Sequence, residues 1–151
     1  MNIELVKCGR EDLELIWKMQ LEAFAGLLEK YQDYSTSPGA EDISKIKARF
    51  EMERSYFYFI VASGVKVGVI RIVDASPKRI SPIFVMSEYR NKGYAQDAIA
   101  AAEEIYGSSD WKLETILEEK GNCHLYEKVG YVRKGEPETV NDRMHLVVYE
   151  K

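Results

Sequence analysis

RNKGYAQDAIAAAEE, residues 90–104, joins a basic, glycine-containing turn to an alanine-rich stretch that favours a helix. The first N–H groups of a helix have no intrahelical acceptor, and the helix dipole favours negative charge beside them. Gly93 has no Cβ, so the main chain can approach a bulky anion; Arg90 and Lys92 add positive charge, and an arginine can form paired bonds to phosphate oxygens. The segment therefore predicts an anion site, with phosphate as the favoured ligand. An ordinary solvated turn with chance basic residues is the alternative when the motif is taken alone.

The sequence on either side of this segment predicts one mixed α/β (α+β) domain over residues 1–151. Periodic apolar residues indicate helices, and aromatic or β-branched runs bounded by Gly and Pro indicate strands. In chain order we expect a strand at 3–6, helices at 12–28 and 41–52, strands at 56–62, 65–73 and 79–86, a helix at 93–106, a strand at 111–117, a short helix at 122–129, and strands at 131–134 and 144–149. An antiparallel meander thus precedes a strand–helix–strand crossover.

Pro82 lies inside the expected strand at 79–86. A proline cannot donate to a strand ladder, so a regular central strand is disfavoured at this point. We therefore expect either a bulge or a local parting of the strands near Pro82.

Composition excludes several classes of protein. With 46% hydrophobic and 30% charged residues, the 151-residue chain is of ordinary globular composition, and its net charge of −4 disfavours a general nucleic-acid binder. Cys8 and Cys123 form no CxxC pair, which leaves zinc ribbons and disulfide frameworks unsupported. No apolar run is long enough to span a membrane, and we expect a cytoplasmic protein. Neither a P-loop motif nor a dinucleotide-binding glycine motif is present.

Two motifs together carry a resemblance to a known family. IFVMSEYRNKGYAQDAI, residues 83–99, is an apolar strand, a turn and a glycine motif that opens a helix, and GNCHLYEKVGY, residues 121–131, is an asparagine followed by a short helix that ends in Gly-aromatic. These motifs, in this order of elements along nearly the whole chain, resemble the GNAT N-acetyltransferase superfamily. The departures are Ala95, where glycine is also common, and Ser87, where many members have proline. The resemblance implies a mixed central sheet of about seven strands, flanked by four helices, with parted fourth and fifth strands.

The resemblance also implies an acetyl-CoA site. The pyrophosphate would be held by the main-chain N–H groups of Arg90, Asn91, Lys92, Gly93, Tyr94 and Ala95. The main chain of Phe84 and Val85 would pair with the pantetheine arm like an added strand, and Asn122 would donate a hydrogen bond to that arm.

The resemblance makes Tyr126 the expected catalytic residue. When an amine attacks a thioester, the leaving group is a thiolate, and a phenol with an ordinary pKa of about 10 can supply its proton. A packed aromatic ring is the alternative reading of Tyr126. The strand at 79–86 offers no glutamate or histidine as a general base, so Glu114 acting through water is a candidate, unless the amine arrives neutral.

The acceptor is expected to be a primary amine of a small molecule or peptide. The resemblance implies that residues 26–42 shape its pocket. This segment carries carboxylates and aromatic rings that could receive a cation, unless it is an ordinary polar loop: Glu29, Tyr31, Asp33, Tyr34, Glu41 and Asp42. A non-catalytic acyl-CoA-binding sensor and a transferase for longer acyl groups are the rival hypotheses. We expect no metal, because His124 and His145 have no clustered ligands, and an acyl-cysteine at Cys123 lacks a supporting pattern. A homodimer is possible from the resemblance only.

Overall fold

The computed structural model describes residues 2–151. Its elements follow the predicted order, and their bounds are β1 (Glu4–Lys7), α1 (Leu13–Tyr31), α2 (Ile43–Glu51), β2 (Ser55–Ala62), β3 (Val65–Val73), β4 (Lys78–Val85), α3 (Tyr94–Tyr106), β5 (Trp111–Ile116), α4 (Lys120–Lys128), β6 (Val132–Thr139) and β7 (His145–Glu150). No helix among these residues is long and apolar enough to cross a membrane.

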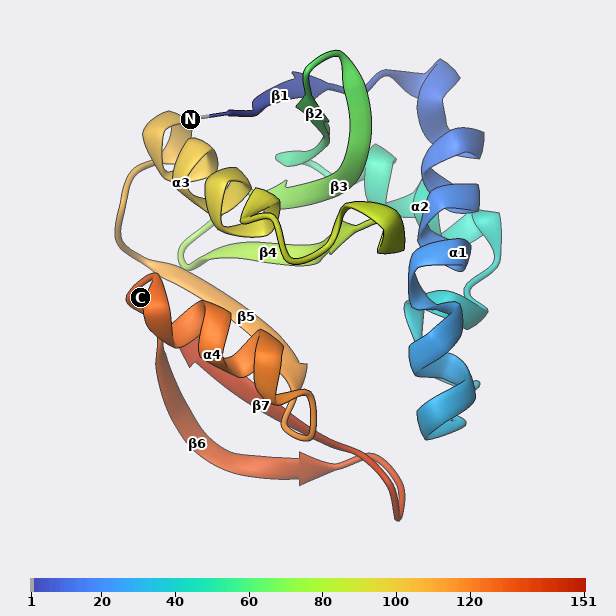
Figure 1. Cartoon of the computed structure of the whole chain (residues 1–151), viewed down its shortest axis with the longest axis vertical. Coiled ribbons are helices and arrows are strands. Elements are labelled where there is room, and N and C mark those ends of the chain that lie inside the picture. The colour runs from blue at the N-terminus through green and yellow to red at the C-terminus, as the bar shows by residue number, and fades with distance from the viewer. Residues whose placement is uncertain (1) are drawn as a thin grey trace.

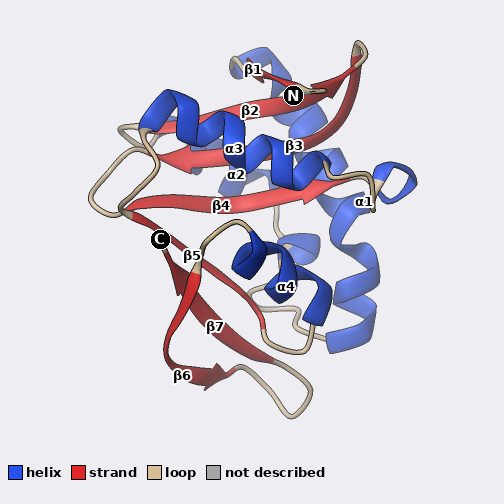
Figure 2. Cartoon of the chain, turned by 60° about the vertical axis from the view of Figure 1, so that its left-hand side comes forward, coloured by secondary structure: helices blue, strands red, loops and turns tan. Residues whose placement is uncertain are grey.

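The seven strands form one mixed sheet in the order β1-β2-β3-β4-β5-β7-β6. Strands β4 and β5 run parallel, while the other neighbouring strands run antiparallel. Helices α3 and α4 cover one face of the sheet, and α1 and α2 lie against the other (Figure 1, Figure 2). The predicted sheet of seven strands with four flanking helices is therefore confirmed.

Strand β2 contributes buried side chains to the cores on both faces of the sheet. Successive side chains of a strand point to opposite faces. Phe57 and Phe59 pack with the residues of α1 and α2, whereas Tyr58 and Ile60 pack with those of α3 and α4. Each of these four residues is buried. The aromatic and β-branched run of β2 is therefore core on both sides, as expected of a strand enclosed between helices.

The expected bulge lies at Pro82. Ile70 of β3 pairs with Ile83 and Ile72 pairs with Ile80, so Arg71 faces both Ser81 and Pro82. Arg71 is buried, and its Nη1 donates to the Ser81 carbonyl oxygen at 2.8 Å. The guanidinium thus satisfies a carbonyl beside the bulge, which holds the irregular backbone in place.

Strands β4 and β5 separate after a short paired stretch. Their paired residues are Lys78 with Trp111 and Arg79 with Lys112, and beyond these β5 continues to pair with β7 on its other edge. The predicted parting of the fourth and fifth strands is confirmed. It leaves one edge of β4 without a strand partner from Ile80 onward.

Some element ends differ from those predicted. α1 continues to Tyr31 and α4 begins at Lys120, two residues before Asn122. β6 extends to Thr139, although Gly and Pro interrupt its sequence, because its register shifts before it pairs again with β7 at Leu146. A single-sequence pattern does not record the tertiary contacts at these ends, so the predicted elements are shorter than the observed ones.

Candidate active site

The turn before α3 presents a run of main-chain N–H groups with no protein acceptor. Asn91 and Gly93 have positive φ angles of 64° and 82°, and Gly93 is the N-cap without a side-chain cap. The first helical bond runs from Asp97 N–H to the Gly93 carbonyl at 2.9 Å. Among residues 2–151 no acceptor lies within bonding distance of the N–H groups of residues 91–96. Unpaired N–H groups at a helix start form a site for an anion.

The side chain of Arg90 does not extend this site. Its Nε donates to the Val85 carbonyl at 3.0 Å and its Nη2 donates to the Ala23 carbonyl at 2.8 Å. The guanidinium therefore fastens the turn to β4 and α1, and the paired bonds to a phosphate that we expected of it stay a prediction. The main-chain N–H of Arg90 makes a long bond of 3.4 Å to Ser87, so the free N–H groups begin at Asn91.

Val85 directs its main chain toward the gap between β4 and β5. The N–H of Met86 donates to Val67 of β3 at 2.8 Å. Along an antiparallel ladder, successive residues direct their main-chain N–H and C=O groups to opposite edges of the strand. The main-chain groups of Phe84 therefore point toward β3, and those of Val85 point toward the opposite edge. The added-strand pairing that we expected for both residues is consequently open to Val85 and not to Phe84.

A cavity of about 400 Å³ extends from the turn before α3 along this open edge. Nearly all residues expected to hold a cofactor line it, namely Phe84, Val85, Arg90, Asn91, Gly93, Tyr94, Ala95 and Asn122. Lys92 is exposed and is not among the lining residues. An added Cβ on Gly93 would have no atom within 4 Å, so the space in front of this glycine is open.

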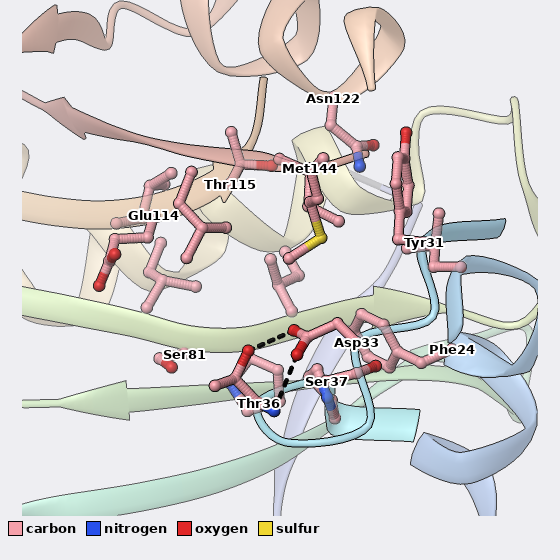
Figure 3. A pocket seen from close by; sticks show the side chains of 18 of the residues that line it. Phe24, Tyr31, Asp33, Thr36, Ser37, Ser81, Glu114, Thr115, Asn122 and Met144 are labelled. Carbon is pink, nitrogen blue, oxygen red and sulfur yellow. Dashed lines mark hydrogen bonds between the residues drawn. The ribbon is translucent and has the colours of Figure 1, made fainter. Parts of the chain in front are cut away.

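A second cavity of about 290 Å³ lies between α1, the loop after it and the parted strands (Figure 3). The two cavities share lining residues, so they meet at a common junction formed by Phe24, Leu27, Ile83, Asn122 and Tyr126. The structure therefore places the expected catalytic tyrosine between a phosphate-compatible cavity and a separate pocket.

Tyr126 has a buried ring and a hydroxyl without a protein partner. The ring packs against Tyr131 and Tyr149, with centroid distances of 6.1 Å in both pairs. Among the described residues no atom forms a hydrogen bond with its hydroxyl, which is not sealed from solvent. Burial raises the pKa of Tyr126 to about 12. The phenol therefore stays protonated at neutral pH and can donate a proton or a hydrogen bond.

The proposed base remains a prediction. Glu114 lines the second cavity, and its Oε1 lies 3.4 Å from Nη2 of Arg79. Both side chains are about two-fifths exposed, so this ion pair is solvated and weak. Glu114 is thus within the pocket and accessible to water, which is what relay of a proton would require.

Of the acidic and aromatic residues expected at the acceptor pocket, Tyr31 and Asp33 line the cavity. The others are engaged elsewhere or lie outside its lining: Glu41 pairs with Arg49, Asp42 caps α2 through Ser44 N–H, Tyr34 is 63% exposed, and Glu29 is exposed. The end of α1 therefore contributes one phenol to the pocket, and the loop after it contributes one carboxylate.

A contact that the sequence did not predict links Glu119, which lines the first cavity, to Tyr31, which lines the second. Glu119, just before α4, accepts from Lys30 Nζ at 2.7 Å and from the Tyr31 hydroxyl. Burial raises the pKa of Glu119, but the hydrogen bonds from Lys30 and Tyr31 outweigh this effect and lower it overall. The partners are 88 and 89 residues apart in the chain, so no local pattern could have indicated the contact.

The fold thus carries two joined cavities along its parted strands, and one of them is bordered by unpaired main-chain N–H groups. A family model described as an acetyltransferase (GNAT) domain matches residues 28–151, which is most of the chain. The chain therefore belongs to the GNAT acetyltransferase family and is an acyltransferase. No curated protein matches the sequence.

Solved structures with the same fold support this placement. The spermidine N-acetyltransferase from Vibrio cholerae in complex with CoA and spermine has a TM-score of 0.74 and 16% identity, covering 98% of this chain and 94% of that chain. An acetyltransferase from Salmonella typhimurium that modifies the N-terminal serine of a 50S ribosomal subunit protein has a TM-score of 0.72 and 14% identity, covering 99% and 94%. The ribosomal-protein-alanine N-acetyltransferase from Escherichia coli has a TM-score of 0.70 and 13% identity, covering 97% and 91%. At such identities the likeness concerns the fold.

Proposed function

We propose that this protein transfers an acetyl group from acetyl-CoA to a primary amine of a small molecule or peptide, by direct attack in a ternary complex. The observation that carries the proposal is the junction of the two cavities at Tyr126. One cavity offers unpaired N–H groups for phosphates, the other offers a pocket for an acceptor, and a protonated phenol lies where they meet. Relatives of this fold act on spermidine and on a ribosomal subunit protein, so both small-molecule and peptide amines fit the proposal.

The first cavity fits acetyl-CoA by its donor groups. The N–H groups from Asn91 to Ala95, together with that of Gln96, would hold the pyrophosphate, because they are unpaired and lie at the positive end of the α3 dipole. The Val85 N–H would bond the pantetheine arm along the open edge of β4, and Asn122 would donate to the same arm from α4. Acetyl-CoA bound in this way supplies an acyl carbon that is activated as a thioester.

Tyr126 would act as the general acid. The amine forms a new C–N bond to the acyl carbon as the C–S bond breaks, and the electron pair of that bond remains on sulfur. The Tyr126 hydroxyl donates a proton to this sulfur, and the proton that the amine releases restores the balance through water, with Glu114 as the candidate acceptor. Burial keeps the pKa of this phenol above its ordinary value, so the hydroxyl carries its proton at the start of each cycle.

A panel of amines, scored by release of free thiol from acetyl-CoA, tests the proposal. We expect thiol release that depends on at least one class of primary amine, with the acetylated amine as product. Binding of acetyl-CoA without turnover on any amine would instead support the non-catalytic sensor. A comparison of acetyl-CoA with longer acyl-CoA donors on the same amine separates acetyl transfer from transfer of a larger group.

A further inference from the structure

Asp33 is the one fully buried carboxylate among residues 2–151, and no cation pairs with it. It is 5% exposed, and no Lys, Arg or His nitrogen of the described chain lies within 4 Å of its oxygens. It accepts from Ser35 Oγ at 3.2 Å, from Thr36 N–H at 3.1 Å and from the Thr36 hydroxyl. A carboxylate has about four acceptor positions, so one remains open.

Asp33 lies on the wall of the acceptor pocket. Figure 3 shows it on the side formed by the loop after α1, across from Thr115 and Asn122. A buried charge is costly unless it is paired. A ligand that brings positive charge to Asp33 would therefore gain more than one that brings a neutral group.

The rest of the pocket determines what such a ligand must look like. Its other charged lining residues, Arg79 and Glu114, already form an ion pair with each other. The remaining wall is mixed, with aliphatic side chains such as Ile80, Leu113 and Leu146 beside uncharged polar ones such as Thr115 and Asn122. A buried carboxylate that no cation of the described chain pairs with, in a pocket whose wall is partly apolar, fits a ligand with one held cation and an apolar chain.

The held cation is a different group from the amine that reacts. Tyr126 lies at the junction of the two cavities, whereas Asp33 lines the acceptor pocket alone. An ammonium paired with a carboxylate keeps its proton and has no free electron pair, so it cannot attack a thioester. The nucleophile must be neutral near Tyr126 while Asp33 holds a second group in its charged form.

We propose, on the basis of the acetyl transfer proposed above, that the acceptor carries a second cationic group, joined to the reacting amine by an apolar chain and bound by Asp33. Asp33 is then a residue that determines specificity, because its negative charge, held in place by the loop, recognises the cationic group of the acceptor. Thr36 and Ser35 orient the carboxylate and leave one of its acceptor positions for the ligand.

Diamines and matched amino alcohols test this directly. In each pair, from ethylenediamine to hexamethylenediamine, the amino alcohol has a hydroxyl in place of the second amine and so differs in the distal charge. For wild-type protein we expect kcat/KM to be about 10-fold to 100-fold higher for the best diamine than for its amino alcohol, as charged hydrogen bonds provide. The Asp33→Asn variant keeps an oxygen acceptor for Thr36 and removes the charge, so the ratio should fall to about one to three.

Ser37→Ala is the matched control, because it removes a hydrogen bond of the same loop, from the Gly39 N–H to the Ser37 hydroxyl, and leaves the Asp33 carboxylate with all its donors. Its ratio should stay near that of wild type. A wild-type ratio near one, or a high ratio that survives in Asp33→Asn, overturns the role of Asp33. The wild-type ratio needs no variant, so it decides the matter even if Asp33→Asn fails to fold. Acetyl-CoA binding with no transfer to any diamine or amino alcohol overturns the transfer itself, which is a different result from transfer without preference.

Discussion

The two edges of strand β4 contrast in how their main-chain groups are used. On the β3 side the ladder runs from Arg79 to Val85 and is interrupted by one bulge. On the β5 side the pairing stops after Arg79, and cavities follow the rest of the edge. The same strand thus forms a hydrogen-bonded ladder on one edge and, from Ile80 onward, an open edge on the other.

This difference shows how the fold separates stability from binding. The β3 edge is fixed by hydrogen bonds and by close packing at Gly68, where an added Cβ would lie 2.1 Å from the Phe84 carbonyl oxygen. The open edge borders the two cavities and Tyr126. Changes on the first edge should therefore act on folding, and changes around the second should act on ligands and turnover.

The largest expected effect is on the paired edge, at Gly68→Ala. The added Cβ meets backbone atoms that cannot move independently of the sheet, so the free energy of unfolding should fall by more than about 3 kcal/mol. Urea unfolding followed by circular dichroism measures it. Gly26→Ala is the control, because Gly26 is exposed in α1 with no atom within 4 Å of an added Cβ, and it should be neutral or stabilise by up to about 1 kcal/mol. If the two variants were equally stable, the proposed role of the paired β4 edge in stability would be contradicted.

The next effect concerns the open edge, at Tyr126→Phe. Loss of the hydroxyl removes the proposed acid, so kcat should fall by about 100-fold or more, as for other general acids. The ring and its packing remain, so the dissociation constant of CoA and the melting temperature should change little. Steady-state kinetics with calorimetric titration of CoA measures both. An unchanged kcat would assign Tyr126 to packing alone.

A smaller effect is expected at the helix start, at Gly93→Ala. Its φ of 82° is strained for alanine, and the turn must shift to relieve it, so CoA binding should weaken by about tenfold with about 1 kcal/mol of lost stability. Gly64→Ala is a matched control, since Gly64 has a φ of 78° in the β2–β3 turn and equally open space. It should lose similar stability with no change in CoA binding; a loss of CoA binding in both variants would mean that general destabilisation, and not the site, is being measured.

The smallest effect is expected at Glu119→Gln, in the contact that joins α1 to the segment before α4. The pKa of Glu119 is lowered in the folded protein, so its contribution is fully present above the unfolded pKa of about 4.3 and is lost as pH falls through the folded value. The variant should be less stable than wild type by under about 1 kcal/mol at pH 7, and the difference should disappear near pH 3. Thermal melts across this range test it, with Glu29→Gln as the exposed control; a difference that persists at low pH would contradict the account.

Local sequence patterns were sufficient to predict the elements and their order. The alternation in β2, the positions of Gly93 and Gly107 at the ends of α3, and the effect of Pro82 on β4 all depend on residues that are close in the chain. The motif at 90–95 likewise located the helix start that presents free N–H groups, because helix capping is a local property.

The parts that were missed depend on distant partners. The guanidinium of Arg90 bonds to Ala23, which is 67 residues away, and Glu119 is held by α1. The main-chain groups of Val85, but not those of Phe84, point toward the gap because of the register between β3 and β4. The sequence does not specify this register near a bulge. Asp33 was one of six candidates in its loop, and only the folded loop distinguishes it as the buried carboxylate of the pocket.

A crystal structure of the protein with bound CoA tests the central claim most directly. The account predicts that pyrophosphate oxygens lie within about 3.2 Å of several N–H groups of residues 91–96, that the pantetheine arm follows the open edge of β4 at Val85, and that the sulfur reaches the hydroxyl of Tyr126. A structure in which CoA leaves those N–H groups without a phosphate, or in which its sulfur lies away from Tyr126, would contradict it.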